Sequence, residues 1–222
     1  MSTKRSTHER TLRMTQLALL SAVIIMMTFV PYIGYISYGP GLSITLIHIP
    51  VMIGAIVMGP SAGAVLGTVW GVSCIVKALT APPSPLDAAI FWNPLVSLFP
   101  RILAGLLAGL IFRGVLTLCR KLKRKGGIGK AAQGISAGVS AAGGSIVNTV
   151  LVLGAIYLMY GTRFGEELGI NIISLGGLID YILLAFAANA SLEAAVCVLI
   201  SVPVSYPLIR LLKPRAKRME EN

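Results

Sequence analysis

The chain has 222 residues, of which 55% are hydrophobic and 12% are charged, and its net charge is +11. Soluble domains usually contain about 25% charged residues, so this composition excludes an ordinary soluble protein and indicates a membrane protein. The basic residues are not interleaved with aromatic residues, so the positive charge does not indicate a nucleic-acid partner.

The first predicted membrane helix covers residues 11–32. Most of it lies in a stretch, residues 14–76, that contains no Asp, Glu, Lys or Arg and has room for about three spans of roughly 20 residues each. Basic residues before an apolar stretch also occur in signal peptides. No small-residue cleavage site follows here, and further spans do, so we interpret the segment as a membrane helix.

The second predicted helix covers residues 43–58, and the third ends near residue 79. A loop of sequence GYISYGPG precedes them, and its glycines and proline favour a turn. The two helices are joined at residues 59–63 by GPSAG, which matches the G-x-S-x-G pattern of serine hydrolases. That chemistry needs a histidine beside the serine, whereas His48 is about 16 Å away along the helix. We therefore predict a tight turn.

Three further helices are predicted at residues 93–121, 131–160 and 178–212. The loop before the first of them, TAPPSPLDAAIFW, contains three prolines and is not expected to be regular helix throughout. The basic linker RKLKRKGGIGK and the polar loop GTRFGEELGINIISLGG separate the others. We expect an all-α integral membrane protein in which residues 1–222 form a single domain of six transmembrane helices with short cytoplasmic tails.

The basic residues predict the orientation of these helices. Sixteen of the 19 lie in three segments, residues 4–13, 113–130 and 210–218, which flank apolar spans. Positive charge beside membrane spans marks the cytoplasmic side, so we place all three segments there, in contact with anionic membrane lipids. An even number of spans also puts both termini on one side. We therefore expect a multi-pass protein with both termini in the cytoplasm.

Small residues recur at every fourth position in several predicted helices. Such strips let two helix backbones approach closely, and we expect the glycine strips to pack within the chain. The glycines concerned are Gly63, Gly67, Gly71, Gly105 and Gly109. For Ala18 and Ala22, near the cytoplasmic end of the first helix, docking of another protein is an alternative to internal packing.

Motifs for energy supply and metal binding are absent from the sequence. No P-loop of pattern GxxxxGK[ST] appears, so active transport by this chain would draw its energy from another protein. The three cysteines, Cys74, Cys119 and Cys197, form no CxxC pair, which predicts neither a metal site nor a disulfide framework. We expect no cofactor.

Three segments carry a resemblance to a known family. They are TQLALLSAV, LSITLIHIPVMIGAIVMGPSAGAVLGTVWG and NPLVSLFPRILAGLLAGLIFR. With these segments, over about half of its length, the chain resembles the substrate-binding S components of energy-coupling factor (ECF) vitamin transporters. Within that family it is most similar to the pantothenate branch, and the cobalamin, folate and riboflavin branches are relatives.

The resemblance implies a six-helix subunit of the bacterial cell membrane that has no ATPase activity of its own. Such a subunit captures a vitamin outside the cell, here pantothenate, with cobalamin, folate or riboflavin as alternatives. It then topples in the membrane and delivers the vitamin inward with an EcfT-type membrane scaffold and two cytoplasmic ATP-binding subunits. In this family an AxxxA strip on the first helix contacts the scaffold, and Ala18 and Ala22 match that strip.

Arg101 is a charged residue inside an apolar span. It lies 19 residues before Arg120, about 28 Å along the helix, and therefore in the outer part of the membrane. A charge facing lipid at the centre of the bilayer costs about 2.5–3.5 kcal/mol, so the guanidinium must meet a partner or a watery site. The carboxylate of pantothenate matches a guanidinium through two parallel hydrogen bonds. Pairing with Glu193 would satisfy the charge equally well, and both interpretations remain open.

Other polar residues of the spans and of the first outer loop complete the candidate substrate-binding site. They are Tyr35, Tyr38, His48, Trp70, Asn93, Asn148 and Asn189. Hydrogen bonds between helices are the alternative role for those in the spans, and tyrosines are also common at the membrane interface. An intramembrane enzyme lacks support, since no paired carboxylates or suitably spaced His–Ser pair are present. A membrane assembly protein without a ligand is the remaining alternative.

Overall fold

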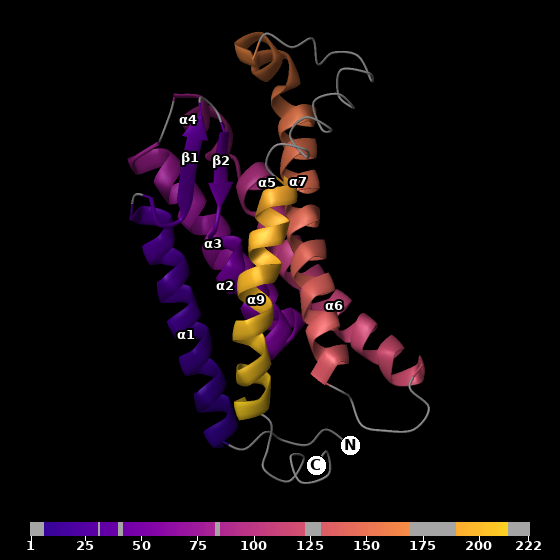
Figure 1. Cartoon of the computed structure of the whole chain (residues 1–222). Coiled ribbons are helices and arrows are strands. Elements are labelled where there is room, and N and C mark those ends of the chain that lie inside the picture. Colours follow the sequence, from indigo (N-terminus) through magenta and orange to yellow (C-terminus); the bar gives the residue numbers. More distant parts are fainter. Residues whose placement is uncertain are drawn as a thin grey trace.

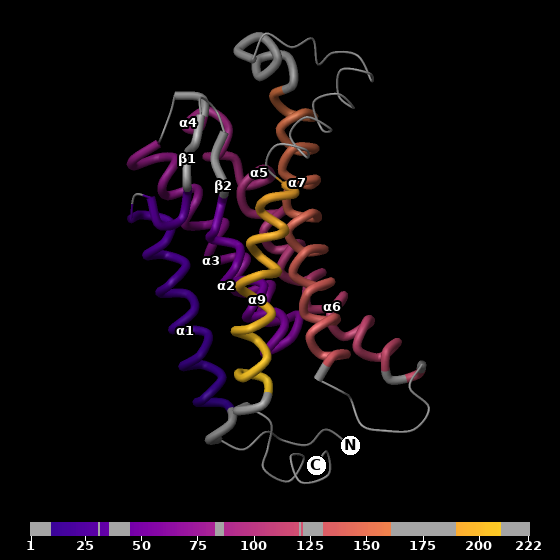
Figure 2. The backbone as a smooth tube through the Cα atoms, viewed as in Figure 1, coloured from indigo at the N-terminus to yellow at the C-terminus, as the bar shows by residue number. Residues whose placement is uncertain are grey.

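The computed structural model describes residues 7–30, 32–39, 42–82, 85–122, 130–168 and 190–212. Long helices lie side by side, with a small hairpin at one end (Figure 1), and Figure 2 traces the same path along the chain. The elements in chain order are α1 (Thr7–Phe29), β1 (Tyr35–Gly39), β2 (Leu42–Thr45), α2 (His48–Met58), α3 (Pro60–Thr80), α4 (Pro85–Phe91), α5 (Pro94–Ser97), α6 (Phe99–Leu122), α7 (Lys130–Leu168) and α9 (Ser191–Leu212).

Five segments are long and apolar enough to cross a membrane. They are Arg10–Phe29, Pro60–Thr80, Pro94–Cys119, Ala131–Tyr160 and Ser191–Ile209, and α2 is a shorter apolar helix of 11 residues. This confirms the predicted class, a helical membrane bundle, to which the structure adds one hairpin. The count of six spans stays a prediction, because residues 169–189, where the sixth was expected to begin, lie outside the described ranges.

The prediction of a helix from residue 43 is wrong at its start. Residues Leu42–Thr45 form β2, which pairs antiparallel with β1 so that Tyr35 lies opposite Thr45. A helix beginning at residue 43 would place Pro50 in its interior, where the ring clashes with the preceding turn and a hydrogen bond is lost. Because α2 begins at His48, Pro50 falls in the first turn, where proline is tolerated.

Two predictions about helix ends have different outcomes. The proline-rich segment after α3 is not one regular helix, as expected, since Trp92 and Asn93 separate the short helices α4 and α5. In contrast, α7 continues to Leu168, beyond its predicted end at residue 160. The glycines of this segment do not stop the helix, because a glycine in a helix costs only about 1 kcal/mol relative to alanine.

The helices α3 and α6 pack through their glycine strips. A Cβ atom added to Gly63 would overlap the carbonyl oxygen of Gly105, and one added to Gly105 would overlap that of Gly63. In the same way, Gly67 faces the backbone of Arg101 and Gly109 faces Pro60. These contacts confirm that the strips serve packing within the chain. They also hold the backbone of Arg101 directly against α3.

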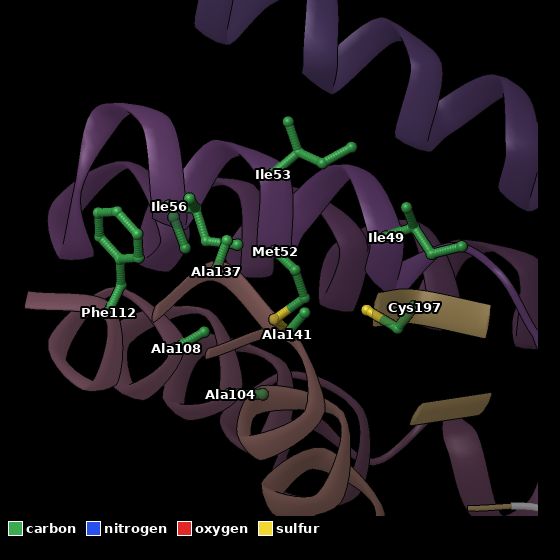
Figure 3. Packing of buried hydrophobic residues seen from close by; sticks show 11 residues of the cluster. Ile49, Met52, Ile53, Ile56, Ala104, Ala108, Phe112, Ala137, Ala141 and Cys197 are labelled. Carbon is green, nitrogen blue, oxygen red and sulfur yellow. The ribbon is translucent and has the colours of Figure 1, made fainter. Parts of the chain in front are cut away.

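A second packing centre lies between α2, α6, α7 and α9. Figure 3 shows Met52 of α2 beside small side chains that include Ala108 and Ala141. Gly144 makes room for Met52, since a Cβ atom there would overlap its sulfur atom. The small residues also let α7 approach α6, and Ser140 Oγ donates to the carbonyl oxygen of Ala108 at 2.6 Å. This packing buries α2 in the bundle and fixes its first residue near the hairpin.

The two ends of the bundle differ in what they carry. The ends of α1, α6, α7 and α9 that adjoin the three basic segments lie together, at the lower end in Figure 1, and the hairpin lies at the other end. Gly59, with a φ of 97°, joins α2 to α3, and Arg13 Nη2 donates to Ser61 Oγ at 2.8 Å. The GPSAG sequence is therefore a tight turn, as predicted. His48 lies at the opposite end of α2.

Candidate ligand-binding site

Arg101 lies in the first turn of α6, toward the hairpin end of the bundle, and is 7% exposed. Its guanidinium carbon lies 5.3 Å from the ring centroid of Trp70, on α3, and 5.6 Å from that of Phe91, on α4. Its Nη1 donates a hydrogen bond to the carbonyl oxygen of Val96. Two aromatic rings and one carbonyl group thus hold the cation in place.

No carboxylate forms an ion pair with Arg101 in the part of the chain that the structure describes. Glu193, the partner considered above, is also buried, at 8% exposed, but its Oε1 accepts a hydrogen bond from the Thr45 N–H at 2.7 Å. Arg101 Nε has no hydrogen-bond partner among the described residues. Glu193 therefore ties α9 to the hairpin, and Arg101 retains an N–H group for another acceptor.

Two more buried polar atoms near Arg101 lack partners within the described ranges. They are Nε1 of Trp70, which is 1% exposed, and Nε2 of His48, which is 2% exposed, and the two ring centroids are 6.5 Å apart. Buried polar atoms are normally hydrogen-bonded. Of the atoms of this kind in the described ranges, these three lie on neighbouring side chains of α2, α3 and α6, which makes this place the candidate for a ligand site. All three side chains are almost closed to solvent in this structure.

Asn148 is a further candidate, on α7. Its side-chain oxygen is buried and has no hydrogen-bond partner in the described part of the chain. Gly144 packs against Ala108, and α7 runs antiparallel to α6. From this contact, Asn148 lies about one helical turn (about 5.4 Å) toward the hairpin end, and Arg101 lies about two turns in the same direction. Asn148 is therefore roughly one turn deeper in the bundle than Arg101. It lies on the same half of the bundle as the other three.

Asn93 uses both ends of its amide for contacts within the fold. Its Oδ1 accepts a hydrogen bond from the Leu95 N–H at 3.0 Å and caps α5, while its Nδ2 donates to the hydroxyl of Tyr160 at 3.3 Å. These bonds fix the segment that supplies the Phe91 ring and the Val96 carbonyl to Arg101. The structure thus gives Asn93 a positioning role, and direct contact with substrate stays a prediction.

Tyr35 lies at the base of the hairpin and packs in the same apolar cluster as Trp70. Its hydroxyl lies 3.7 Å from Cys74 Sγ, and Lys77 Nζ lies 4.3 Å from the centroid of its ring. Burial, together with the nearby Cys74 thiol, raises the pKa of Tyr35 well above its usual value. Tyr35 therefore remains an uncharged phenol, and it fixes the hairpin against α3 beside Trp70.

The remaining predicted residues are not joined to this cluster by the structure. Ala18 and Ala22 lie on an exposed face of α1, whereas Ile24 and Thr28 are buried. This exposure leaves the alanines accessible, and docking to a scaffold stays a prediction. The side chain of Tyr38 and the whole of Asn189 lie outside the described part of the chain, so their roles also stay predictions.

Sequence reasoning missed several contacts around the site. Phe91 was not selected, and its only signal is an aromatic residue in the segment just before Arg101. The Val96 carbonyl group and the bond between Glu193 and Thr45 left no signal, because every residue has a backbone carbonyl and every residue except proline has an N–H group.

Comparisons with known proteins concern the family and the fold of the chain. A family model described as "ECF transporter, substrate-specific component" matches residues 12–205. The chain is 30% identical over 177 residues to the pantothenic acid transporter PanT of Lactococcus lactis subsp. cremoris (strain MG1363), covering 74% of this chain and 76% of the relative. It is 36% identical over 94 residues to the pantothenate transporter PanT of Leuconostoc mesenteroides subsp. mesenteroides, covering 41% of this chain and 46% of that relative.

Solved structures with a similar fold include the S component for biotin from an ECF-type ABC transporter. The TM-score is 0.52, with 15% identity, over 90% of this chain and 94% of that chain. For ThiT from Listeria monocytogenes the TM-score is 0.49, with 18% identity, over 94% and 97% of the two chains. At such low identity the likeness to the biotin S component concerns the fold alone.

Proposed function

Since the chain belongs to the family of substrate-specific components of ECF transporters, we propose that it captures pantothenate outside a bacterial cell and delivers it across the cell membrane. It is a multi-pass membrane subunit of a transporter and not an enzyme. Members of this family work with an EcfT-type scaffold and ATPases. We infer the same assembly here, with two cytoplasmic ATP-binding subunits and with both termini of this chain in the cytoplasm.

The observation that carries the proposal is the buried guanidinium of Arg101. Among the described residues it forms no ion pair, although Glu193 lies close enough to interact with it electrostatically, and its Nε has no acceptor. A ligand carboxylate would neutralise the charge and accept charge-assisted hydrogen bonds from it. Because a buried charge without a partner is costly, the ligand would also remove a cost that the empty site carries. The names of the two bacterial relatives support pantothenate as that ligand.

Thiamine and riboflavin fit this cluster less well than pantothenate. Thiamine is a cation, and a like charge placed against Arg101 would cost several kcal/mol. Riboflavin has no carboxylate for Arg101 to bind. Cobalamin and folate are the other vitamins that the resemblance left open. Neither vitamin appears in the names of the matched transporters. A membrane assembly protein without a ligand would leave the unpartnered atoms of His48, Trp70 and Arg101 unexplained.

The proposed contact with the scaffold is the exposed strip of Ala18 and Ala22 on α1. Small side chains at this spacing allow another helix to approach closely. Ala18 lies at the middle of α1 and Ala22 lies nearer Phe29, and both are exposed on the outside of the bundle, whereas the side chains of His48, Trp70 and Arg101 are buried inside it. Docking and ligand binding would therefore use separate surfaces of the chain.

Uptake of labelled pantothenate tests the proposal. Cells without their own pantothenate transport would express the chain alone, the scaffold and ATPases alone, or all of them together. Uptake should occur only with the complete set, and unlabelled pantothenate should compete whereas biotin and thiamine should not. The same cells with the Arg101→Ala chain, verified in the membrane, serve as the control for the site. Uptake of another vitamin, or none by the complete set, would contradict the proposal.

A further inference from the structure

We propose that His48 and Trp70 form a hydroxyl-binding subsite, which receives a hydroxyl group of the ligand while Arg101 binds its carboxylate. The inference rests on the proposed function, because pantothenate carries its two hydroxyl groups at the end of the molecule opposite its carboxylate. Its structural basis is the juxtaposition of two almost fully buried side chains, on α2 and α3, whose side-chain nitrogens Nε2 and Nε1 have no partner in the described part of the chain.

The two side chains offer complementary hydrogen-bonding groups. Trp70 Nε1–H is only a donor, and the proposal assigns His48 the neutral tautomer with its proton on Nδ1, in which Nε2 is an acceptor. A hydroxyl group is both an acceptor and a donor, so a single hydroxyl can satisfy both atoms. A carbonyl oxygen would satisfy Trp70 alone, and an ammonium group would satisfy His48 alone. The pair therefore selects for a hydroxyl group.

The distances suit one ligand that engages all three residues. The ring centroids of His48 and Trp70 are 6.5 Å apart, close enough for both side chains to line one ligand group, and the proposed subsite requires an oxygen about 3 Å from each nitrogen. The guanidinium carbon of Arg101 lies 5.3 Å from the Trp70 ring centroid. Pantothenate has about eight bonds from its carboxylate carbon to its terminal hydroxyl, which at roughly 1.2 Å per bond gives about 10 Å. The separations of 5.3 Å and 6.5 Å set the upper limit on the span from Arg101 past Trp70 to His48, and a ligand of this length can cover it.

The surroundings of Trp70 match the rest of the molecule. Ile24, Ile47, Val51 and Leu66 pack with Trp70 in one apolar cluster. Next to its hydroxyl groups pantothenate carries a carbon with two methyl groups, for which apolar surroundings are favourable. Trp70 contacts Arg101 as well as His48, so the arrangement also fixes the direction of the ligand. Its carboxylate points toward α6 and its hydroxyl groups point toward α2.

The test compares four ligands on the purified chain by isothermal titration. They are pantothenate, two analogues that each lack one hydroxyl group, and an amide analogue that lacks the charged carboxylate. In the wild type, at least one deoxy analogue should bind about tenfold to a hundredfold more weakly than pantothenate. The missing hydroxyl group leaves buried polar groups of the protein unpaired. In Trp70→Phe, which removes the N–H group and keeps an aromatic ring, this difference should largely disappear. The difference between pantothenate and its amide should persist.

Trp92→Phe is the matched control, because it makes the same chemical change at the other tryptophan of the chain, which is 51% exposed and outside the cluster. It should bind all four ligands as the wild type does. His48→Leu is the second variant, and it removes the acceptor instead of the donor. It should reduce the difference between pantothenate and the same deoxy analogue.

Two results would overturn the subsite while the proposed function stands. In one, the wild type binds both deoxy analogues as tightly as pantothenate. In the other, Trp70→Phe weakens all four ligands by the same factor, which is the behaviour of a residue that serves only the fold. If the wild type binds no pantothenate at all, the proposed function itself fails. The comparison of pantothenate with its deoxy analogues on the wild type tests the subsite even where a variant does not fold.

Discussion

At the scale of single residues, Arg101 connects the sequence to the chemistry of the site. A charge within an apolar span needs a partner, and the structure supplies the rings of Trp70 and Phe91 and one carbonyl group in place of a carboxylate. Cation–π contacts contribute about 0.5–2 kcal/mol, which is well below the interaction with a hydrogen-bonded carboxylate in the same surroundings. The protein therefore stabilises the buried positive charge of Arg101 only in part.

Arg101→Ala should weaken pantothenate binding. Removing one member of a buried charge pair typically costs about 2–5 kcal/mol, which corresponds to roughly 30-fold to several thousand-fold in affinity. Arg101→Lys should recover only part of the loss, since an ammonium group lacks the planar fork of the guanidinium. Titration of pantothenate and its amide into wild type and variant measures this. If Arg101→Ala weakens both ligands by the same factor, Arg101 serves the fold and does not bind the carboxylate.

Residue types in the spans could be predicted from the sequence, whereas their partners could not. His48, Trp70 and Arg101 stand out because polar side chains are costly among apolar ones. Asn93 stands out for the same reason, yet its amide bonds Leu95 and Tyr160 within the fold. Packing between distant segments decides which polar residue keeps an atom without a hydrogen-bond partner. Composition and spacing do not predict that packing.

At the scale of elements, the hairpin and α2 depart most from the prediction. The apolar run that includes α2 is long enough for a membrane helix, but Pro50 limits where a helix can begin, and the preceding residues pair as strands. Membrane helices then hold the base of the hairpin from two sides. Lys77 of α3 lies over Tyr35 of β1, and Glu193 of α9 accepts the Thr45 N–H of β2. The spans were predictable from hydropathy, and these ties depend on tertiary structure.

Gly63→Ala should destabilise the packing of α3 against α6. The added Cβ atom would overlap the Gly105 carbonyl oxygen, and such overpacking typically costs about 1–3 kcal/mol. Gly134→Ala is the matched control, because a Cβ atom there meets nothing within 4 Å and alanine favours the helix. Thermal unfolding of the purified chains should show a lower melting temperature for the first variant alone. Equal melting temperatures would mean that α3 and α6 can move apart to accommodate the added methyl group without a loss of stability.

Ala22→Trp should prevent assembly with the scaffold and leave pantothenate binding intact. A bulky indole at this exposed position of α1 would keep another helix from close approach, and α1 needs no internal repacking to accept it. Co-purification with the scaffold and ATPases measures assembly, and titration measures binding. The exposed Leu19→Trp, on the same helix, controls for bulk in general. Normal assembly and uptake with Ala22→Trp would refute docking through this strip.

At the scale of the whole molecule, the distribution of charge and the arrangement of the helices agree. The three basic segments adjoin the same end of the bundle, whereas His48, the first residue of α2, and Arg101, in the first turn of α6, lie toward the hairpin end. Because positive segments favour the cytoplasm, we expect the proposed ligand site to lie on the outer side of the membrane. A subunit that captures a solute from outside requires that placement.

Cysteine labelling in whole cells tests this orientation. In a chain whose native cysteines are replaced by serine, Glu166→Cys should react with an impermeant thiol reagent added outside, and Lys125→Cys should react only after the membrane is opened. The first residue lies on α7 toward the hairpin end, and the second belongs to the basic linker. Reaction of both residues in intact cells would contradict the orientation.

The most direct test of the central claim is equilibrium binding of vitamins to the purified chain without its partners. Pantothenate should bind at one site per chain and raise the melting temperature in proportion to the logarithm of its concentration above the Kd. Biotin, thiamine, riboflavin, folate and cobalamin at the same concentrations should leave the melting temperature unchanged. If one of these vitamins binds and pantothenate does not, the chain is a substrate-binding subunit for a different ligand, and the assignment of Arg101 to the carboxylate of pantothenate is wrong.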